Sequence, residues 1–199
     1  MLYTVGCSVH TPENFIYLLK NHAIDVIADV RSKPFSRYTP QFNQHQLKKT
    51  LREAGIMYVS LATEFGAHRI ELEAYSEGRV DFSKVRELEK FKQGILRINQ
   101  GLTKGYAIAL MCTEKDPLEC HRFSLVAKNL KSELKTPINH ILFDGSLETN
   151  ESLEMRMLSK LKLELSLFED NLDRLIEKAY TIVGKKIAYT EQLGEENES

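Results

Sequence analysis

The sequence has few cysteines, no excess of charge of either sign and no long apolar segment, and each absence excludes a class of protein. Three of its 199 residues are cysteines, an odd, low number that argues against a disulfide framework and fits a reducing cytoplasm. The net charge is −1, from 27 basic and 28 acidic residues, so a broad basic surface for nucleic acid is absent and at most a local basic patch is left. No apolar run approaches the roughly 20 residues that span a bilayer. Because the chain enters a strand-like run directly at Leu2, without the features of a signal peptide, we expect a cytoplasmic protein with no membrane partner.

What is present is the pattern of a globular α/β protein. Hydrophobic residues make up 42% of the chain and charged residues 28%, which are ordinary globular values. Short apolar runs typical of buried strands alternate with helix patterns, and they cover Leu2–Cys7, Ile24–Val30, Ile56–Leu61, Gly105–Cys112 and Ile138–Phe143. This alternation predicts a Rossmann-like three-layer fold over residues 1–143, with a mostly parallel sheet of about five strands and helices on both faces.

Residues 144–199 differ from the rest and predict a C-terminal helical appendage. Residues 144–150 form a polar, turn-rich linker. After it, apolar residues follow alternating spacings of three and four, as in a short coiled-coil seam: Leu158, Leu161, Leu165, Phe168, Leu172, Leu175 and Ala179. A helix, or a pair of helices, packed on its own domain is the simpler interpretation, and a homodimer through this helix is the alternative. The chain ends in a short acidic tail from Gly194.

Polar and reactive residues follow the first four of the five predicted strands. They are Cys7, Ser8 and His10; Arg31, Ser32 and Arg37; Glu64, His68 and Arg69; and Cys112, Glu114, Cys120, His121 and Arg122. Since parallel strands end at a common edge, and ligands of open α/β sheets bind outside the carboxyl ends of the strands, we expect a binding site there.

The segment from Met111 to Arg122 carries two thiols, a carboxylate, an imidazole and a guanidinium. Asp116 fits a helix cap, Pro117 the first helical position, and Glu119 the partner that closes a capping box. Cys120, His121 and Arg122 would then lie in the first turns of a helix. Its amide groups and positive dipole end favour an anion and can lower the pKa of a thiol.

We therefore expect Arg31, Arg37 and Arg122 to bind an anion, because arginine offers a permanent charge and a planar fork suited to phosphate. The competing interpretation is that Asp29 or Glu114 pairs with one of these arginines and braces a loop. Ser8, Ser32, Cys112 and His121 would complete the substrate-binding surface. Glu114 would act as the acid or base, and Cys120 as a nucleophile or as pocket lining.

A zinc site built from Cys7, Cys112, Cys120 and His121 is chemically permissible, and so is a redox pair of Cys112 with Cys120. The sequence contains no close Cys-x-x-Cys spacing, however, and Cys7 is most simply a small buried apolar residue. We therefore predict no metal ligands, and no cofactor is required by the sequence.

Several motifs, in the same order, resemble the domain of unknown function 488 family over roughly residues 2–143. They are Thr4-Val-Gly-Cys-Ser8, Asp29-Val-Arg-Ser-Lys-Pro34, Ser36-Arg37, Pro40-Gln-Phe-Asn43, Gly55-Ile-x-Tyr58, Leu110-Met-Cys-x-Glu-Lys-x-Pro117, Cys120-His-Arg122 and His140-Ile141. The resemblance implies a compact α/β domain with a polar site and brings no settled reaction. The first motif of the family usually reads Gly-His-Ser or Gly-His-Thr, whereas this chain has Cys7 in the position of the histidine.

Together these features predict an enzyme that binds a phosphate-bearing small molecule, a nucleotide or a nucleotide derivative, and hydrolyses it or transfers a group. One alternative is a non-catalytic module that binds a nucleotide or nucleic acid. The other is a thiol-redox or metal-binding protein.

Overall fold

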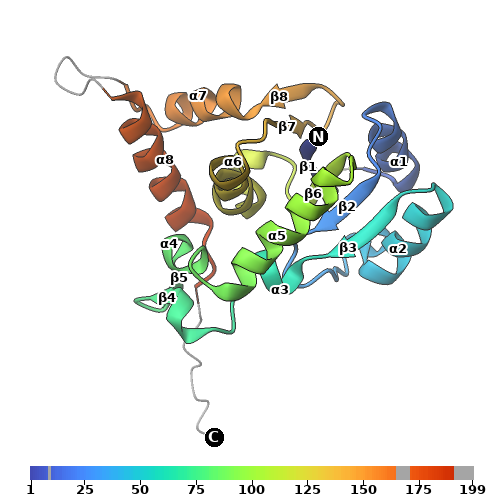
Figure 1. Ribbon diagram of the computed structural model, residues 1–199, viewed down its shortest axis with the longest axis horizontal. Coiled ribbons are helices and arrows are strands. Elements are labelled where there is room, and N and C mark those ends of the chain that lie inside the picture. The colour runs from blue at the N-terminus through green and yellow to red at the C-terminus, as the bar shows by residue number, and fades with distance from the viewer. Residues whose placement is uncertain (9, 165–170, 191–199) are drawn as a thin grey trace, which may run out of the picture.

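The computed structural model describes residues 1–8, 10–164 and 171–190, which form a three-layer α/β fold (Figure 1). Six strands form the main sheet in the order β3-β2-β6-β1-β7-β8, parallel except for β8. These strands are β1 (Leu2–Gly6), β2 (Val26–Asp29), β3 (Met57–Ser60), β6 (Ile108–Cys112), β7 (Ile138–Ile141) and β8 (Leu147–Thr149). The predicted fold class is confirmed, and each predicted apolar run contains one of the parallel strands. The strand order differs from the order 3-2-1-4-5-6 of dinucleotide-binding folds.

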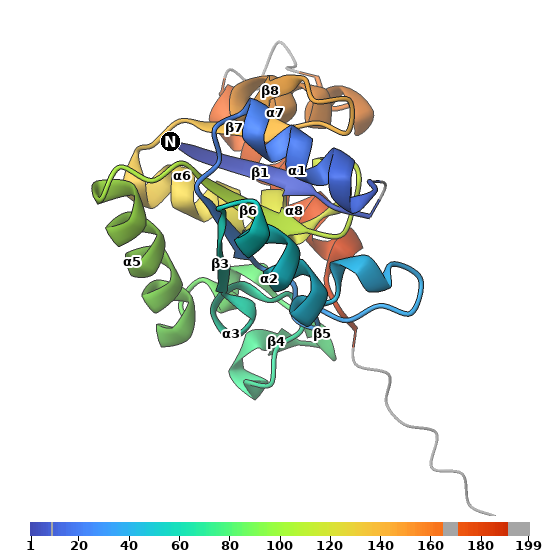
Figure 2. The same ribbon diagram turned by 90° about the vertical axis from the view of Figure 1, so that its right-hand side faces the viewer.

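Helices cover both faces of this sheet. The α-helices are α1 (Pro12–Asn21), α2 (Gln44–Glu53), α3 (Ala62–Phe65), α4 (Phe82–Val85), α5 (Glu89–Thr103), α6 (Lys128–Leu134), α7 (Asn150–Lys160) and α8 (Leu172–Ile187). Helices α1 and α2 pack on one face through residues such as Phe15 and Leu51 (Figure 2). Helices α5 and α6 pack on the other face through residues such as Phe91 and Leu130. The sheet therefore separates two apolar clusters, one on each of its faces.

The connections make the carboxyl end of β6 a topological switch point of the sheet. Strands β1 and β2, on either side of β6, lead into α1 and α2 on one face, whereas β6 leads toward α6 on the other. Adjacent strands whose connections diverge in this way leave a crevice at their carboxyl ends, where open α/β sheets bind ligands. The segment that follows Cys112 begins at this switch point.

Two parts of the chain between β3 and β6 differ from the predicted pattern. The helix expected over about residues 82–99 is two helices, α4 and α5, because Leu88 is extended (φ −63°, ψ 138°). Despite the break at Leu88, Val85 of α4 and Phe91 of α5 are both fully buried. The polar stretch before it contains a small hairpin of β4 (Tyr75–Ser76) and β5 (Arg79–Val80).

The C-terminal region is joined to the sheet by a strand and two helices. Strand β8 falls within the predicted turn-rich linker and pairs with β7, so part of that segment is an edge strand of the sheet. Helices α7 and α8 share a third apolar cluster with Phe123 and Leu118, as expected for a helical pair on its own domain. Leu165 and Phe168 of the predicted seam lie outside the described residues.

In the described parts of the chain, no helix has the length and apolar character needed to traverse a lipid bilayer.

A buried histidine links β1, β7 and α7. His140 is fully buried, with Nδ1 2.8 Å from Thr4 Oγ1 and Nε2 3.3 Å from Asn150 Oδ1. Burial, together with the charge of Arg122, lowers the pKa of His140 to about 3. The folded protein therefore holds this imidazole neutral at a pH where the unfolded chain, with a pKa of about 6.5, already takes up a proton.

This histidine is expected to make stability fall in acid. Its contribution is fully present above about pH 6.5 and is lost as the pH falls toward about 3, at roughly 1.4 kcal/mol of unfolding free energy per pH unit. Urea denaturation at about pH 7 and about pH 5 measures this slope. In the variant His140→Gln, the dependence of the unfolding free energy on pH should be weaker by the contribution of one proton. The variant His45→Gln, which changes an exposed histidine, should show the same pH dependence as wild type. Equal slopes in wild type and His140→Gln would contradict the prediction.

Candidate functional site

The loop and helix after β6 position the candidate site. As expected, the carboxylate of Asp116 accepts a hydrogen bond from the amide of Leu118 (3.0 Å). What it caps, however, is a single 3₁₀ turn, Pro117–Glu119, followed by an extended Cys120 and a π-helix, Arg122–Ala127, that runs into α6. Glu119 bonds to Lys160 (3.1 Å) instead of closing a capping box. The expectation that Cys120 lies in the first turn of a helix is therefore wrong.

The same correction removes the helix N-terminus as an anion site. The amides of Leu118, Glu119 and Cys120 donate to Asp116 and Pro117 within the 3₁₀ turn. Because these donors are satisfied locally, they do not offer the free amides of a long helix.

The extended conformation of Cys120 brings four predicted site residues together. Its sulfur lies 2.8 Å from Glu114 Oε2 and 4.0 Å from His121 Nδ1. The sulfur of Cys112, at the end of β6, lies 3.8 Å from the same Nδ1. The amide of Arg122 also points at the sulfur of Cys120 (3.5 Å). Two thiols, a carboxyl and an imidazole thus form one contiguous cluster at the carboxyl end of β6.

The imidazole of His121 is fixed by the neighbouring strand. Its Nε2 lies 2.9 Å from the carbonyl oxygen of Val30, just after β2, and as the donor of that bond it leaves Nδ1 free of hydrogen and facing the sulfurs. Cys112, Cys120 and His121 are all buried. The geometry of the cluster is therefore set by packing between two adjacent strands.

This environment shifts the pKa values of the cluster in opposite directions. Burial raises the pKa of Cys120, but the hydrogen bond with Cys112 and the charge of Arg122 outweigh it, so this pKa lies well below its usual range. Burial, and then the negative sulfur of Cys120, raise the pKa of Glu114. Opposed shifts of this kind let a carboxyl and a thiol share one proton, an arrangement suited to proton transfer.

Cys7 lies at the end of β1 and behaves differently. Its amide donates to the carbonyl of Cys112 (3.0 Å), and its side chain is fully buried in the apolar cluster of α1 and α2. Burial raises the pKa of its thiol to about 12. Cys7 is therefore an inert core residue, as expected from the sequence.

The three arginines predicted to bind an anion have different environments. Arg31 is buried and makes a bidentate pair with Asp29, through Nε–Oδ1 (2.9 Å) and Nη2–Oδ2 (2.7 Å), so the alternative of a braced loop applies to it. The guanidinium of Arg122 is fully buried and donates to the carbonyls of Glu114 (2.7 Å) and Lys115 (3.3 Å). Arg37 is exposed. Hence two of the three arginines are engaged within the protein, and only Arg37 extends into solvent.

Arg122 is nevertheless a buried cation without a carboxylate. Among the described residues it forms no salt bridge, and its Nε has no hydrogen-bond partner. Gly6 allows this close packing, since a Cβ at that position would lie 2.1 Å from the carbonyl oxygen of Glu114 and 3.3 Å from Arg122 Nη2. A buried positive charge favours a negative group beside it, which the cluster of thiols and Glu114 can provide.

The two predicted serines lie at the ends of β1 and β2. The amide of Ser8 donates to the carbonyl of Thr113 (3.1 Å), which ties the first loop to the fourth. The hydroxyl oxygen of Ser32 accepts a hydrogen bond from the amide of His68 (2.8 Å). Both residues are half-buried, and each of these bonds supports a loop at the carboxyl edge of the sheet.

One side chain that sequence reasoning missed supports the site from α7. Arg156 makes two hydrogen bonds to the carboxylate of Asp116, each 3.1 Å long, and also bonds to Glu148 of β8 (2.9 Å). Nothing in the sequence signalled this contact, because it joins residues 40 positions apart across the predicted domain boundary.

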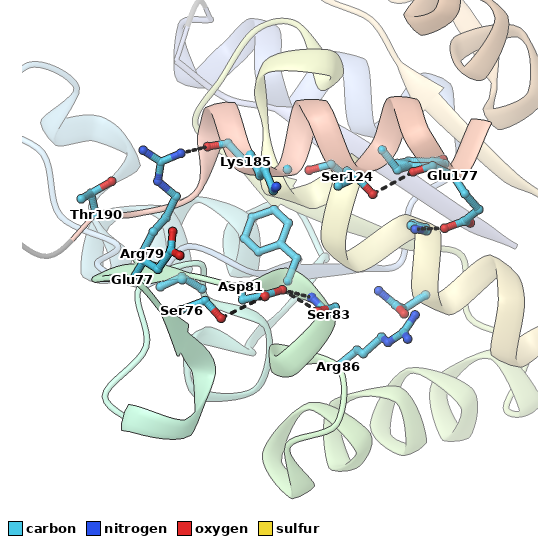
Figure 3. Close-up of a pocket in the computed structure, with 17 residues that line it drawn as sticks. Ser76, Glu77, Arg79, Asp81, Ser83, Arg86, Ser124, Glu177, Lys185 and Thr190 are labelled. Atoms are coloured by element: carbon cyan, nitrogen blue, oxygen red, sulfur yellow. Dashed lines mark hydrogen bonds and ion pairs between the residues drawn. The ribbon is translucent and has the colours of Figure 1, made fainter. Parts of the chain in front are cut away.

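Two hollows lie away from the end of β6. One, of about 730 Å³, lies between the β4–β5 hairpin, α4 and α8 (Figure 3). Its charged side chains bond mainly to neighbouring groups, as in Lys128–Glu177 (2.6 Å) and Arg79 with the carbonyl of Lys185 (3.1 Å). The second, of about 800 Å³, adjoins α6, α7 and α8. Neither is lined by any of the predicted site residues.

Comparison with known proteins agrees with the motifs. No curated protein and no solved structure matches the chain. Residues 11–129, more than half of the chain, match the family described as "Domain of unknown function DUF488". The matched segment contains the cluster of Cys112, Glu114, Cys120 and His121, together with Arg31, Arg37 and Arg122. The chain therefore belongs to the DUF488 family.

Proposed function

We propose that the protein is an enzyme that binds a phosphate-bearing small molecule, a nucleotide or nucleotide derivative, in the crevice at the end of β6, and hydrolyses it or transfers a group from it. The observation that carries the proposal is the partly buried contact of Glu114 with Cys120 (2.8 Å). A carboxyl held in this way can give and take a proton during bond cleavage.

The position of the contact supports the proposal. Glu114 follows β6 and lies where the connections of adjacent strands diverge, and its side chain is only partly covered. Cys120 and His121 behind it are buried. Glu114 is therefore the member of the cluster that a substrate in the crevice would meet first.

The charges around the crevice favour an anionic substrate. The Asp29–Arg31 pair is neutral overall, whereas the charge of Arg122 is not balanced by a salt bridge in the described residues. The loop after β2 also exposes Arg37 and Lys33 to solvent. In this proposal the phosphate is bound by the exposed cations of that loop, and Arg122 contributes through its field.

Substitution of Glu114 tests the proposal. A panel of nucleotides and sugar nucleotides is first screened by thermal shift, since a bound ligand stabilises the folded protein, and the binders are then assayed for turnover by chromatography. Glu114→Gln should bind the substrate with unchanged affinity but lose turnover by roughly 100-fold or more.

Glu119→Gln is the matched control. Glu119 is an exposed carboxylate on the same loop and pairs with Lys160, so its substitution should leave turnover unchanged. A wild type that neither binds nor converts any member of the panel, or a Glu114→Gln variant with full turnover, would refute the proposed reaction.

A non-catalytic nucleotide-binding module is the second candidate, and the loop after β2 favours it. Tyr38 is 96% exposed and Phe35 is 69% exposed, next to Arg37. Aromatic side chains beside cations are typical of surfaces that stack bases. Salt-sensitive binding of an oligonucleotide that persists in Glu114→Ala but is lost in Tyr38→Ala would support this candidate over the enzyme.

A further inference from the structure

We infer that Cys112, Cys120 and His121 form a binding site for a divalent zinc ion. The three ligand atoms, two Sγ and one Nδ1, all lie within 4.8 Å of one another. The two sulfur–nitrogen distances are 3.8 and 4.0 Å. In a tetrahedral zinc site, with bonds of about 2.3 Å to sulfur and about 2.0 Å to nitrogen, neighbouring ligand atoms lie roughly 3.5–3.8 Å apart. Small side-chain shifts therefore close this triangle around an ion.

The orientation of the imidazole supports a metal ligand. Nε2 of His121 is held by the carbonyl of Val30 at 2.9 Å, which leaves the lone pair of Nδ1 directed at the two sulfurs. A ligating histidine almost always donates its second ring N–H to a carbonyl or carboxylate, and this bond fixes its tautomer and ring plane. The ring is thus already oriented as a ligand, and by a strand adjacent to β6.

The charges balance when the ion is present. Two thiolates neutralise Zn²⁺, and the imidazole ligand is neutral. The carboxylate of Glu114, in contact with Cys120, then offsets the buried guanidinium of Arg122, which has no salt bridge in the described residues. The ion therefore adds no net charge to a region from which solvent is excluded. The amide of Arg122, 3.5 Å from the sulfur of Cys120, stabilises a thiolate there.

The fourth position is left to water. The carboxylate of Glu114 contacts Cys120 (2.8 Å), but Glu114 is not among the described residues whose ligand atoms all lie within 4.8 Å of one another. The donor set of two sulfurs and one nitrogen favours zinc over magnesium or calcium, which take oxygen ligands. The inference departs from the sequence-based expectation of no metal ligands, and Cys7, one of the four ligands considered there, is not part of the cluster.

The inference goes beyond the proposed function and does not rest on it, because it is tested without any substrate. The full-length protein is purified, stripped with a chelator and titrated with Zn²⁺, and the metal is quantified by mass spectrometry. A parallel titration with Co²⁺ follows the thiolate-to-cobalt charge-transfer band and the ligand-field bands of tetrahedral cobalt. We expect one zinc ion per chain and a tetrahedral cobalt spectrum with sulfur ligands.

Variants locate the ion. Cys112→Ser and Cys120→Ser should each weaken zinc binding by more than about 100-fold and abolish the charge-transfer intensity of the lost ligand. Cys7→Ser is the matched control, since Cys7 is as deeply buried as the others but lies outside the cluster, and it should bind zinc like wild type. Wild type that binds no zinc, or equal losses in Cys7→Ser and Cys112→Ser, would overturn the inference.

A measurement on wild type alone covers the case in which a variant does not fold. In partly denaturing buffer, zinc should protect two of the three thiols from a thiol reagent, and peptide mapping should identify them as Cys112 and Cys120. Protection of Cys7 instead would overturn the assignment. A protein that binds zinc but converts no nucleotide refutes only the proposed function, whereas turnover by a zinc-free protein without zinc affinity refutes only the metal site.

Discussion

Replacing Asp29 with asparagine is expected to lower the free energy of unfolding by about 3–5 kcal/mol. Asp29 is 1% exposed and its partner Arg31 is 6% exposed. The substitution leaves a guanidinium buried without its counter-charge, and it also weakens the hydrogen bond from the hydroxyl of Tyr58 to Asp29 (2.9 Å). Chemical denaturation followed by circular dichroism measures the loss.

Two comparisons make this prediction specific to the buried pair. In Asp29→Asn/Arg31→Met both charges are absent, so a substantial part of the lost stability should return. Glu89→Gln removes one partner of an exposed pair with Lys92 and should change stability by less than about 0.5 kcal/mol. A cost below about 1 kcal/mol for Asp29→Asn would mean that Arg31 is solvated and free to bind an anion.

The second large effect is expected for Phe123→Ala, at about 3–5 kcal/mol of unfolding free energy. Phe123 is fully buried, and its ring lies 5.5 Å from that of His140 and 5.0 Å from that of Tyr180, measured between centroids. It therefore joins the π-helix, β7 and α8. Because this contact joins the C-terminal helices to the sheet, fluorescence and circular dichroism should report one coincident unfolding transition in wild type and variant.

Phe35→Ala is the matched control, because it removes the same atoms from a side chain that is 69% exposed; it should cost less than about 0.5 kcal/mol. Separate transitions in the wild type would contradict the prediction and would indicate that residues 144–190 unfold independently of the sheet.

The sheet was predictable because central strands such as β2 (Val26–Asp29) and β6 (Ile108–Cys112) are buried throughout and lie within continuous apolar runs of the sequence. The helix expected at Asp116 was less predictable, because a capping Asp followed by Pro fits a single 3₁₀ turn as well as an α-helix. A spacing pattern of three and four across residues 158–179 likewise does not reveal that α7 ends at Lys160. Local signals therefore identified the elements but not where each of them ends.

The candidate site was only partly predictable for a related reason. The order of motifs indicated that Cys112, Glu114, Cys120 and His121 share one edge of the sheet, and the structure brings these four into contact. The partners of the arginines depend on side-chain directions that spacing does not give. Arg31 turns back to Asp29, two residues earlier, and Arg122 turns to the carbonyls of the preceding loop. The triangle of two sulfurs and one nitrogen likewise needed the extended backbone of Cys120.

The bonds from Arg156 to Asp116 affect how the family segment can be used in isolation. Asp116 belongs to residues 11–129, whereas Arg156 and its second partner Glu148 lie outside them. A chain trimmed to the shared segment would keep every thiol and carboxylate of the cluster but lose the brace on its loop. Chimeras between relatives should consequently exchange residues 116, 148 and 156 as one unit.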